Sequence, residues 1–251
     1  MGSDEDMRGT FVMIDGLDGI GKGVFLEAMK DAALSEGRRV FDLHAYWRTH
    51  NLHPSVSEFM DADIIFSSEP TYTRFGRLIR EELIRKGTNY SAMAIAQAYA
   101  LDRQVLYDEV LKPALSKGIG VIQGRGVSSS LTYQPLDAAL KGEALRLEDL
   151  MALPGNAQAL DEDWVPNVLV IPTVSAEEAM RRLAGREEQD DACFEKYEFQ
   201  LRLKESFEAQ WFRDFFAERG VSLYYPDISG SEADTVAIAT QLYRQCFARE
   251  S

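Results

Sequence analysis

The sequence predicts an α/β fold in which a parallel sheet of about five strands carries helices on both faces. Short apolar runs alternate along the 251 residues with longer segments of helical periodicity. Strands separated by helical crossovers are typical of a parallel sheet that is covered on both sides. No repeat or low-complexity linker divides the chain. We therefore expect a single domain over residues 8–251, preceded by a disordered tail or tag at residues 1–7.

The first strand is predicted at Phe11–Ile14, which is wholly apolar, and the helix after it at residues 24–34, which are amphipathic. Gly37 ends that helix, and Pro113 with Gly118 ends the strongest helical pattern, at residues 91–111. Residues 46–63 read as a long polar connection, and residues 143–164 as a mixture of short helix and loop. Further strands are expected at residues 38–43, 64–67, 120–123, 168–174 and 221–225, and further helices at 75–85, 129–140, from 176 onward, 195–219 and 234–248.

Bulk composition excludes several classes of protein. The formal net charge is −14, which argues against a nucleic-acid polymer or an anionic membrane surface as partner. The two cysteines, Cys193 and Cys246, form neither a disulfide framework nor a zinc pattern, and His44, His50 and His53 match no metal motif and are expected to be surface or structural residues. No apolar run approaches the ~20 residues of a membrane span, and the N-terminus lacks a signal-peptide core. We expect a cytoplasmic protein.

The glycine-rich turn after the first strand carries the strongest functional signal. It matches G-x-x-x-x-G-K, the loop whose backbone N–H groups hold the phosphates of a nucleotide while its lysine bridges the β- and γ-phosphates. The residue after the lysine normally offers a hydroxyl to Mg²⁺, but neither it nor its successor has one here. Carboxylates, water and the phosphates themselves would therefore have to hold the metal. The residues expected to bind ATP are Gly16, Leu17, Asp18, Gly19, Ile20, Gly21, Lys22, Gly23 and Val24.

Three charged residues follow predicted strands, and in a parallel sheet ligands bind at the carboxyl ends of the strands. Asp18 lies within the glycine-rich turn, and Glu69 follows the strand at residues 64–67. Arg125 follows the strand at residues 120–123 and is flanked by glycines. Arg125 is therefore predicted to bind a phosphate, and Asp18 or Glu69 could help to hold a metal ion.

Two further groups have both a functional and a structural interpretation. Tyr99 and Arg103 share a helix face, where they could stack on a nucleobase and hydrogen-bond its edge. Spacing alone favours instead a core tyrosine beside a surface arginine. Arg182 and Arg186, on either side of Gly185, could close as a lid over phosphates at about residues 181–194, or could simply end a solvated helix.

Taken in order, these segments resemble those of thymidylate kinase, a nucleoside-monophosphate kinase of the P-loop class. Residues 16–23, GLDGIGKG, are similar to its G-x-D-G-x-G-K loop, and residues 69–80 to its E-P-x-x-T-x-x-G-x-x-I-R segment. Residues 99–103 are similar to its aromatic-x-x-D/N-R stretch, and residues 124–134 to its D-R-x-x-x-S-x-x-x-Y-Q segment. The resemblance covers nearly the whole chain and implies a three-layer P-loop NTPase fold with a short mobile lid. It also implies a homodimeric enzyme that uses ATP, with Mg²⁺, to phosphorylate dTMP to dTDP.

The same resemblance implies roles for individual residues. Asp18 would lie near the acceptor phosphate, Tyr99 would stack on thymine and Arg103 would contact its carbonyl edge. Arg125 would hold the monophosphate. The implied catalytic residues are Asp18, Lys22, Arg125, Arg182 and Arg186, and the implied dTMP-binding residues are Asp18, Glu69, Tyr99, Arg103, Arg125, Ser129, Ser130, Tyr133 and Gln134.

The chain departs from the family pattern at several positions. Gly23 and Val24 lack the hydroxyl, and Gly124 replaces an aspartate that is expected to help hold the metal and the acceptor phosphate. Residues 170–173 lack the usual Leu-Asp-Val, and the 46–63 connection is longer than typical. Two alternatives stay open. One is a deoxynucleoside (thymidine) kinase with Glu69 as the candidate general base, and the other is a nucleotide-binding homologue with weakened catalysis.

Overall fold

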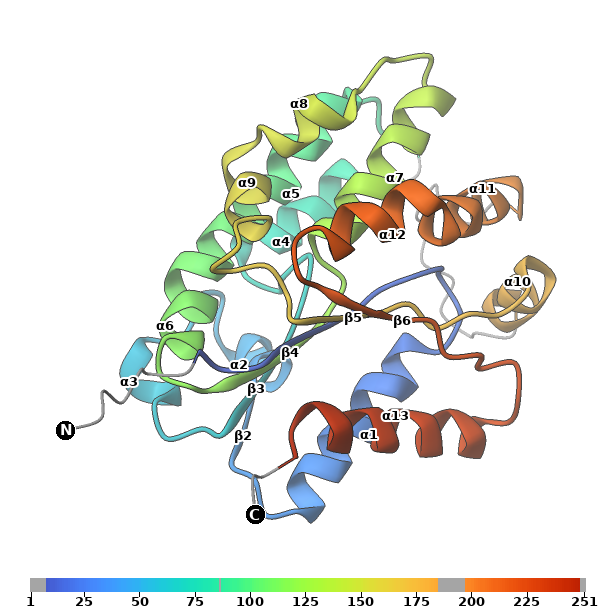
Figure 1. Ribbon diagram of the computed structural model, residues 1–251. Helices are drawn as coiled ribbons and strands as arrows, with labels where there is room; N and C mark the ends of the chain where they lie inside the picture. The colour runs from blue at the N-terminus through green and yellow to red at the C-terminus, as the bar shows by residue number, and fades with distance from the viewer. Residues whose placement is uncertain (1–7, 86, 185–196, 249–251) are drawn as a thin grey trace.

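The computed structural model describes residues 8–85, 87–184 and 197–248, in which helices cover both faces of a parallel sheet (Figure 1). The strand order is β2-β3-β4-β1-β5-β6, and every neighbouring pair is parallel. The predicted α/β class is confirmed, with six strands instead of about five. The strands are β1 (Phe11–Ile14), β2 (Val40–Asp42), β3 (Ile64–Ser68), β4 (Gly120–Gly124), β5 (Val168–Val170) and β6 (Ser222–Tyr224).

The helices form the two outer layers. In Figure 1, α1 and α13 lie side by side on one face of the sheet, while α5, α7, α11 and α12 lie on the other. None of the helices in the described ranges is long and apolar enough to span a bilayer. The helices are α1 (Lys22–Ser35), α2 (Leu43–Thr49), α3 (Val56–Phe59), α4 (Arg74–Leu78), α5 (Ala92–Leu106), α6 (Lys112–Leu115), α7 (Val127–Leu140), α8 (Leu147–Met151), α9 (Pro154–Ala159), α10 (Ala176–Ala184), α11 (Tyr197–Glu208), α12 (Gln210–Ala217) and α13 (Glu232–Cys246), with π-helical turns η1 (Ile79–Leu83) and η2 (Tyr107–Leu111).

The short, uninterrupted apolar runs of the sequence form the central strands of the sheet. All four residues of β1 are fully buried, because β4 pairs on one side, β5 on the other, and helices cover both faces. A strand buried on both faces needs apolar side chains at successive positions. The edge strands β2 and β6 are only partly buried. Because β3, β4 and β1 are neighbours in the parallel sheet, the segments that follow them lie next to one another at one edge of the sheet.

The 46–63 connection contains more regular structure than predicted. Helix α2 begins at Leu43, where the Asp42 carboxylate accepts hydrogen bonds from the first backbone N–H groups of the helix. Helix α3 begins after Ser55, which forms a capping box with Glu58. Both caps were visible in the sequence as an acid and an S-x-x-E pattern. The 46–63 segment is therefore more regular than the predicted polar connection. The 143–164 stretch is a mixture of short helix and loop, as predicted, and its helices are α8 and α9.

The single long helix predicted for residues 195–219 was also wrong. Helix α11 ends at Glu208, Ala209 is extended with ψ 147°, and α12 begins at Gln210. The turn lets each helix bury aromatic side chains, and the rings of Phe207 and Phe212 meet with their centroids 5.4 Å apart. Periodicity does not reveal such a change of direction, because both halves keep an apolar face. The predicted tail at residues 1–7 and the predicted lid beyond residue 184 lie outside the described residues, as does Arg186.

The two histidines of this region that are largely shielded from water have structural surroundings, as predicted. His44 Nε2 lies 2.5 Å from Ser68 Oγ, and burial lowers the pKa of His44. The His53 ring packs edge-on against Trp47, and both of its nitrogens are buried with no hydrogen-bond partner in the described parts of the chain. Burial lowers the pKa of His53 to about 4. His53 is therefore neutral in the folded protein at neutral pH.

We expect the contribution of His53 to the free energy of unfolding to fall as the pH is lowered from 7.5 to 5. The unfolded chain takes up a proton at His53 near its ordinary pKa of 6.5, whereas the folded chain does so only near pH 4. The difference is worth roughly 2 kcal/mol at pH 5. Urea unfolding of His53→Phe should lack this part of the pH dependence, and His50→Phe, at an exposed ring, should keep it. Equal slopes for His53→Phe and the unmodified chain would refute the assignment.

Candidate active site

The glycine-rich loop between β1 and α1 adopts the conformation that its glycines permit. Gly16, Gly19 and Gly21 have positive φ angles of 121°, 77° and 101°, which side chains with a Cβ rarely adopt. The Lys22 ammonium donates to the carbonyl oxygens of Gly16, at 2.8 Å, and of Leu17. Helix α1 starts at Lys22, so the N–H groups of its first turn and the positive end of its dipole face this loop. The arrangement suits a phosphate anion.

The phosphate loop and the arginine after β4 meet directly. Arg125 Nη2 donates to Asp18 Oδ1 of the loop, and the Arg125 guanidinium lies 5.1 Å from the centroid of the Tyr133 ring. The Tyr133 hydroxyl donates to Asp18 Oδ2 at 3.1 Å and to the Gly16 carbonyl at 3.2 Å. Burial raises the pKa of Tyr133 to about 12, so the phenol stays a donor. Asp18, Arg125 and Tyr133, three residues predicted for the site, thus lie together.

The backbone of Arg125 is strained. Its φ angle of 63° is the one positive value among the non-glycine residues that the structure describes. Its own N–H donates to the Ile14 carbonyl at the end of β1, and its carbonyl accepts from Gln123 Nε2. Left-handed backbone at an arginine costs about 1 kcal/mol or more and is typically kept where it aims a functional side chain.

Asp15 is a site residue that the sequence prediction missed. It is fully buried at the carboxyl end of β1 and accepts hydrogen bonds from the hydroxyls of Ser128, at 2.5 Å, and Ser129, at 2.8 Å, and from the Gly16 N–H. Arg125 Nη1 lies 4.0 Å from the same carboxylate. Asp15 therefore joins the start of α7 to the phosphate loop. A lone acid directly after an apolar strand was the signal that could have found it.

A second, fully buried group of polar residues lies behind the first. Arg103, 1 % exposed, pairs with Glu69, 3 % exposed, at 2.6 Å. Arg103 Nη2 also donates to Ser130 Oγ at 3.0 Å, and Nη1 donates to Asn156 Oδ1. Gln123 donates to Glu69 at 3.0 Å. We call Glu69, Arg103, Gln123, Ser130 and Asn156 the Arg103 cluster. The surface arginine that spacing alone favoured was wrong.

The ionisation of Glu69 reflects this environment. Burial raises the pKa of Glu69 to about 7, although the Arg103 guanidinium acts in the opposite direction. Gln134, another predicted pocket residue, donates to Ser130 at 3.2 Å and so borders the cluster. Tyr99 lies on α5 one turn before Arg103, is partly exposed, and contributes after burial and nearer charges to the raised pKa of Tyr133. The predicted dTMP-binding residues are therefore gathered around α5 and α7.

Arg182 lies at the other end of the phosphate loop. It extends from α10 and donates to the carbonyl oxygens of Ile20, at 3.0 Å, and Ile228, at 2.8 Å, while its Nε donates to Glu178 at 2.6 Å. The guanidinium is thus tethered between the phosphate loop and the segment after β6. Its predicted lid partner, Arg186, belongs to the undescribed stretch.

The carboxylates proposed to hold a magnesium ion, Asp18 and Glu69, are both paired with arginines. A Cβ added at Gly124 would lie 2.7 Å from Leu26 Cδ1, so an apolar side chain from α1 occupies the space that an aspartate there would need. Within the described ranges, no three His, Cys, Asp or Glu side chains are grouped to hold a metal ion. A Cβ at Gly23, in contrast, would meet no atom within 4 Å.

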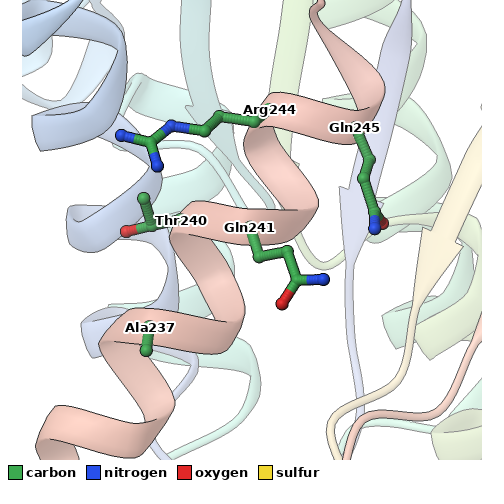
Figure 2. Close-up of a pocket in the computed structure, with 5 residues that line it drawn as sticks. All are labelled: Ala237, Thr240, Gln241, Arg244 and Gln245. Carbon is green, nitrogen blue, oxygen red and sulfur yellow. The ribbon is translucent and has the colours of Figure 1, made fainter.

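A separate hollow lies on the outward face of α13 (Figure 2). All the residues that line it come from that single helix, and none belongs to a segment that follows a strand at the edge described above. It therefore offers no convergent set of polar groups from different elements, which ligand sites normally have. Its lining residues are Ala237, Thr240, Gln241, Arg244 and Gln245.

Comparison with known proteins agrees with this geometry. Residues 50–214 match a family model described as thymidylate kinase. A thymidylate kinase of Caldanaerobacter subterraneus subsp. tengcongensis is 27% identical over 201 residues, which cover 80% of this chain and 81% of the relative. Probable thymidylate kinases of Pyrococcus abyssi and Thermococcus gammatolerans are each 30% identical, over 72% and 79% of this chain and 72% and 81% of the relatives. The chain belongs to the thymidylate kinase family.

Proposed function

We propose that this chain transfers the γ-phosphoryl group of ATP to the 5′-phosphate of dTMP, giving dTDP and ADP. The contact between Arg125 and Asp18 carries the proposal, because it joins the arginine after β4 to the phosphate loop. Two anions bound on these elements would lie end to end. Family membership supports the choice of substrates.

Each group has a role that its position supports. Lys22 and the N–H groups of residues 16–24 would hold the donor phosphates. Arg125 would exchange its ion pair with Asp18 for a contact with the acceptor phosphate. Arg182, with Arg186, would lie along the donor side. Phosphoryl transfer needs placement and charge neutralisation more than covalent chemistry, so no nucleophilic side chain is required. The acceptor nucleoside would bind among Tyr99, Arg103, Ser129, Ser130, Tyr133 and Gln134.

We propose that Mg²⁺ accompanies ATP and is held by phosphate and water oxygens. Magnesium commonly keeps several waters in such sites. This chain supplies little of the usual protein coordination, since Gly23 has no hydroxyl and Leu26 occupies the space beside Gly124. Slow turnover is therefore expected, which is the reason to keep a catalytically weakened homologue as the second candidate. Thymidine as acceptor is disfavoured, because Glu69 pairs with Arg103 and Arg125 suits a phosphate that is already present.

The test is a coupled ADP-release assay with ATP, Mg²⁺ and each nucleoside monophosphate in turn. We expect turnover with dTMP and little with AMP or GMP. Turnover with AMP or GMP but not with dTMP would contradict the substrate assignment, and a phosphorylated product from thymidine would favour the deoxynucleoside kinase. Calorimetric binding of ATP and dTMP without turnover in Mg²⁺ or Mn²⁺ would favour the weakened homologue.

A carboxylate at position 124 should raise turnover only when Leu26 is shortened as well. Gly124→Asp alone places its Cβ 2.7 Å from Leu26 Cδ1, so the leucine has to move and then lies against a buried carboxylate. The double variant Leu26→Ala/Gly124→Asp should raise kcat with Mg²⁺ by at least about tenfold, because metal-side groups are worth several kcal/mol. Leu26→Ala alone is the matched control. No gain in the double variant would mean that position 124 does not face the metal.

Gly23→Ser offers an independent route to the same end. The added side chain has open space, and the φ angle of Gly23 is not in the left-handed region. We expect this variant to fold normally and to raise kcat with Mg²⁺, since it restores the hydroxyl next to Lys22. Loss of turnover with an unchanged free energy of unfolding would argue against a metal ion beside residue 23.

We also propose a cytoplasmic homodimer whose partners are ATP and dTMP rather than nucleic-acid polymers or membranes. Large apolar side chains of the packed pair α4 and α5, namely Phe75, Leu78 and Leu101, are exposed and would suit a second copy. One chain has a mass of 28.2 kDa, and light scattering should give twice that value. A mass of one chain at micromolar concentration would refute the dimer.

A further inference from the structure

The 143–164 stretch reaches the Arg103 cluster through one side chain. Asn156, in the first turn of α9, is fully buried and its Oδ1 accepts from Arg103 Nη1. Its Nδ2 donates to the Leu150 carbonyl at 2.8 Å. Because the amide nitrogen is already bonded to a carbonyl, the oxygen is the atom that faces the guanidinium.

Helix α9 is held against α5 by backbone contact. A Cβ added at Gly155 would lie 1.8 Å from the Ala100 carbonyl oxygen, so only glycine allows this approach. Pro154 occupies the first turn of α9, where a missing N–H costs nothing. The next residue, Asn156, is thereby placed over Arg103, one turn along α5 from Ala100. The docking of α9 and the bond to Arg103 are two results of the same Pro-Gly-Asn sequence.

Arg103 is fixed on two sides. Nη2 bonds Glu69 and Ser130, which come from the predicted acceptor side, and Nη1 bonds Asn156. A guanidinium is planar with a fixed fork of donors, so holding one end of the plane sets the direction of the other. A neutral amide holds it without adding a second charge to compete with Glu69.

We infer that Asn156 is a positioning residue that orients Arg103 for recognition of the acceptor nucleotide. The inference rests on the proposed function, in which Arg103 lies beside the acceptor base. It assigns to the 143–164 stretch a part in substrate selection, although Asn156 would not itself touch dTMP.

The test compares Asn156→Ala with Gln158→Ala. Gln158 lies on the same helix and tethers it to Asp108 at 2.5 Å, but does not bond Arg103. We expect Asn156→Ala to raise the KM for dTMP about tenfold, the loss of one hydrogen bond to a charged group, with the KM for ATP changed less than about twofold. Gln158→Ala should leave both KM values unchanged. Urea unfolding of both variants accompanies the kinetics.

The outcomes separate the inference from the function on which it rests. An unmodified chain that turns over dTMP, with an unchanged dTMP KM in Asn156→Ala, refutes the inference alone. Parallel rises in both KM values, or the same rise in Gln158→Ala, would mean that Asn156 only stabilises α9 and also refutes it. No turnover or binding of dTMP by the unmodified chain refutes the proposed function and the inference with it.

Discussion

Arg125→Ala is expected to lower kcat/KM for dTMP by about 10³-fold, the scale of a transition-state arginine in phosphoryl transfer. Its guanidinium contacts Asp18 of the phosphate loop, lies near the Tyr133 ring and is 4.0 Å from Asp15, so its loss removes the arginine that joins the end of β4 to the loop. The coupled ADP-release assay measures the loss. Arg146→Ala, at an exposed arginine paired with Asp149, is the control and should keep full activity.

Arg125→Gly separates the chemical role from the backbone strain. Both Arg125→Ala and Arg125→Gly lose the guanidinium, so both should be equally inactive. Only glycine adopts a φ angle of 63° without a steric cost at Cβ. The free energy of unfolding of the glycine variant should therefore be about 1 kcal/mol higher than that of the alanine variant. Chemical unfolding at pH 7.5 measures the difference. Substantial activity in either variant would remove Arg125 from the acceptor site.

Arg103→Met is expected to cost about 3–5 kcal/mol in the free energy of unfolding, because it leaves Glu69 buried without its ion pair. The loss should grow as the pH rises above 7. Burial already raises the pKa of Glu69 to about 7, and removal of Arg103 raises it further, so deprotonation in the folded state becomes more costly at higher pH. Urea unfolding at pH 6, 7.5 and 9 measures the trend.

The double variant Glu69→Gln/Arg103→Met is the matched control. Neutralising the acid removes the unpaired buried charge, so this variant should recover most of the lost stability and show no added pH dependence. It should still bind dTMP poorly if Arg103 recognises the base. A single Arg103→Met variant as stable as the unmodified chain would show that the ion pair contributes nothing to the fold.

The parts of the site that could be predicted from the sequence are those whose signals are local. The phosphate loop is marked by an apolar strand followed by four glycines and a lysine within residues 16–24, and Arg125 follows a buried strand directly. The surroundings of Arg103 could not be derived from spacing, since Glu69 and Asn156 reach it from segments 34 and 53 positions away. Family resemblance suggested its role, but not its burial.

Other misses have similar physical causes. The break between α11 and α12 depends on packing of aromatic side chains from both sides of Ala209, which a periodic pattern does not encode. Leu26 was read as one apolar position of an amphipathic helix, and only the fold shows that it lies against Gly124 at the end of β4. The capping residues of α2 and α3, in contrast, are visible in the sequence. The length and polarity of the 46–63 segment nevertheless favoured its interpretation as a connection.

The contact between Leu26 and Gly124 has a consequence for descent within the family. An acid at the end of β4 would place its Cβ 2.7 Å from Leu26 Cδ1, so a bulky aliphatic residue one turn into α1 would have to shift to admit it. Among relatives, the two positions should covary, with small or polar residues opposite aspartate and large aliphatic residues opposite glycine.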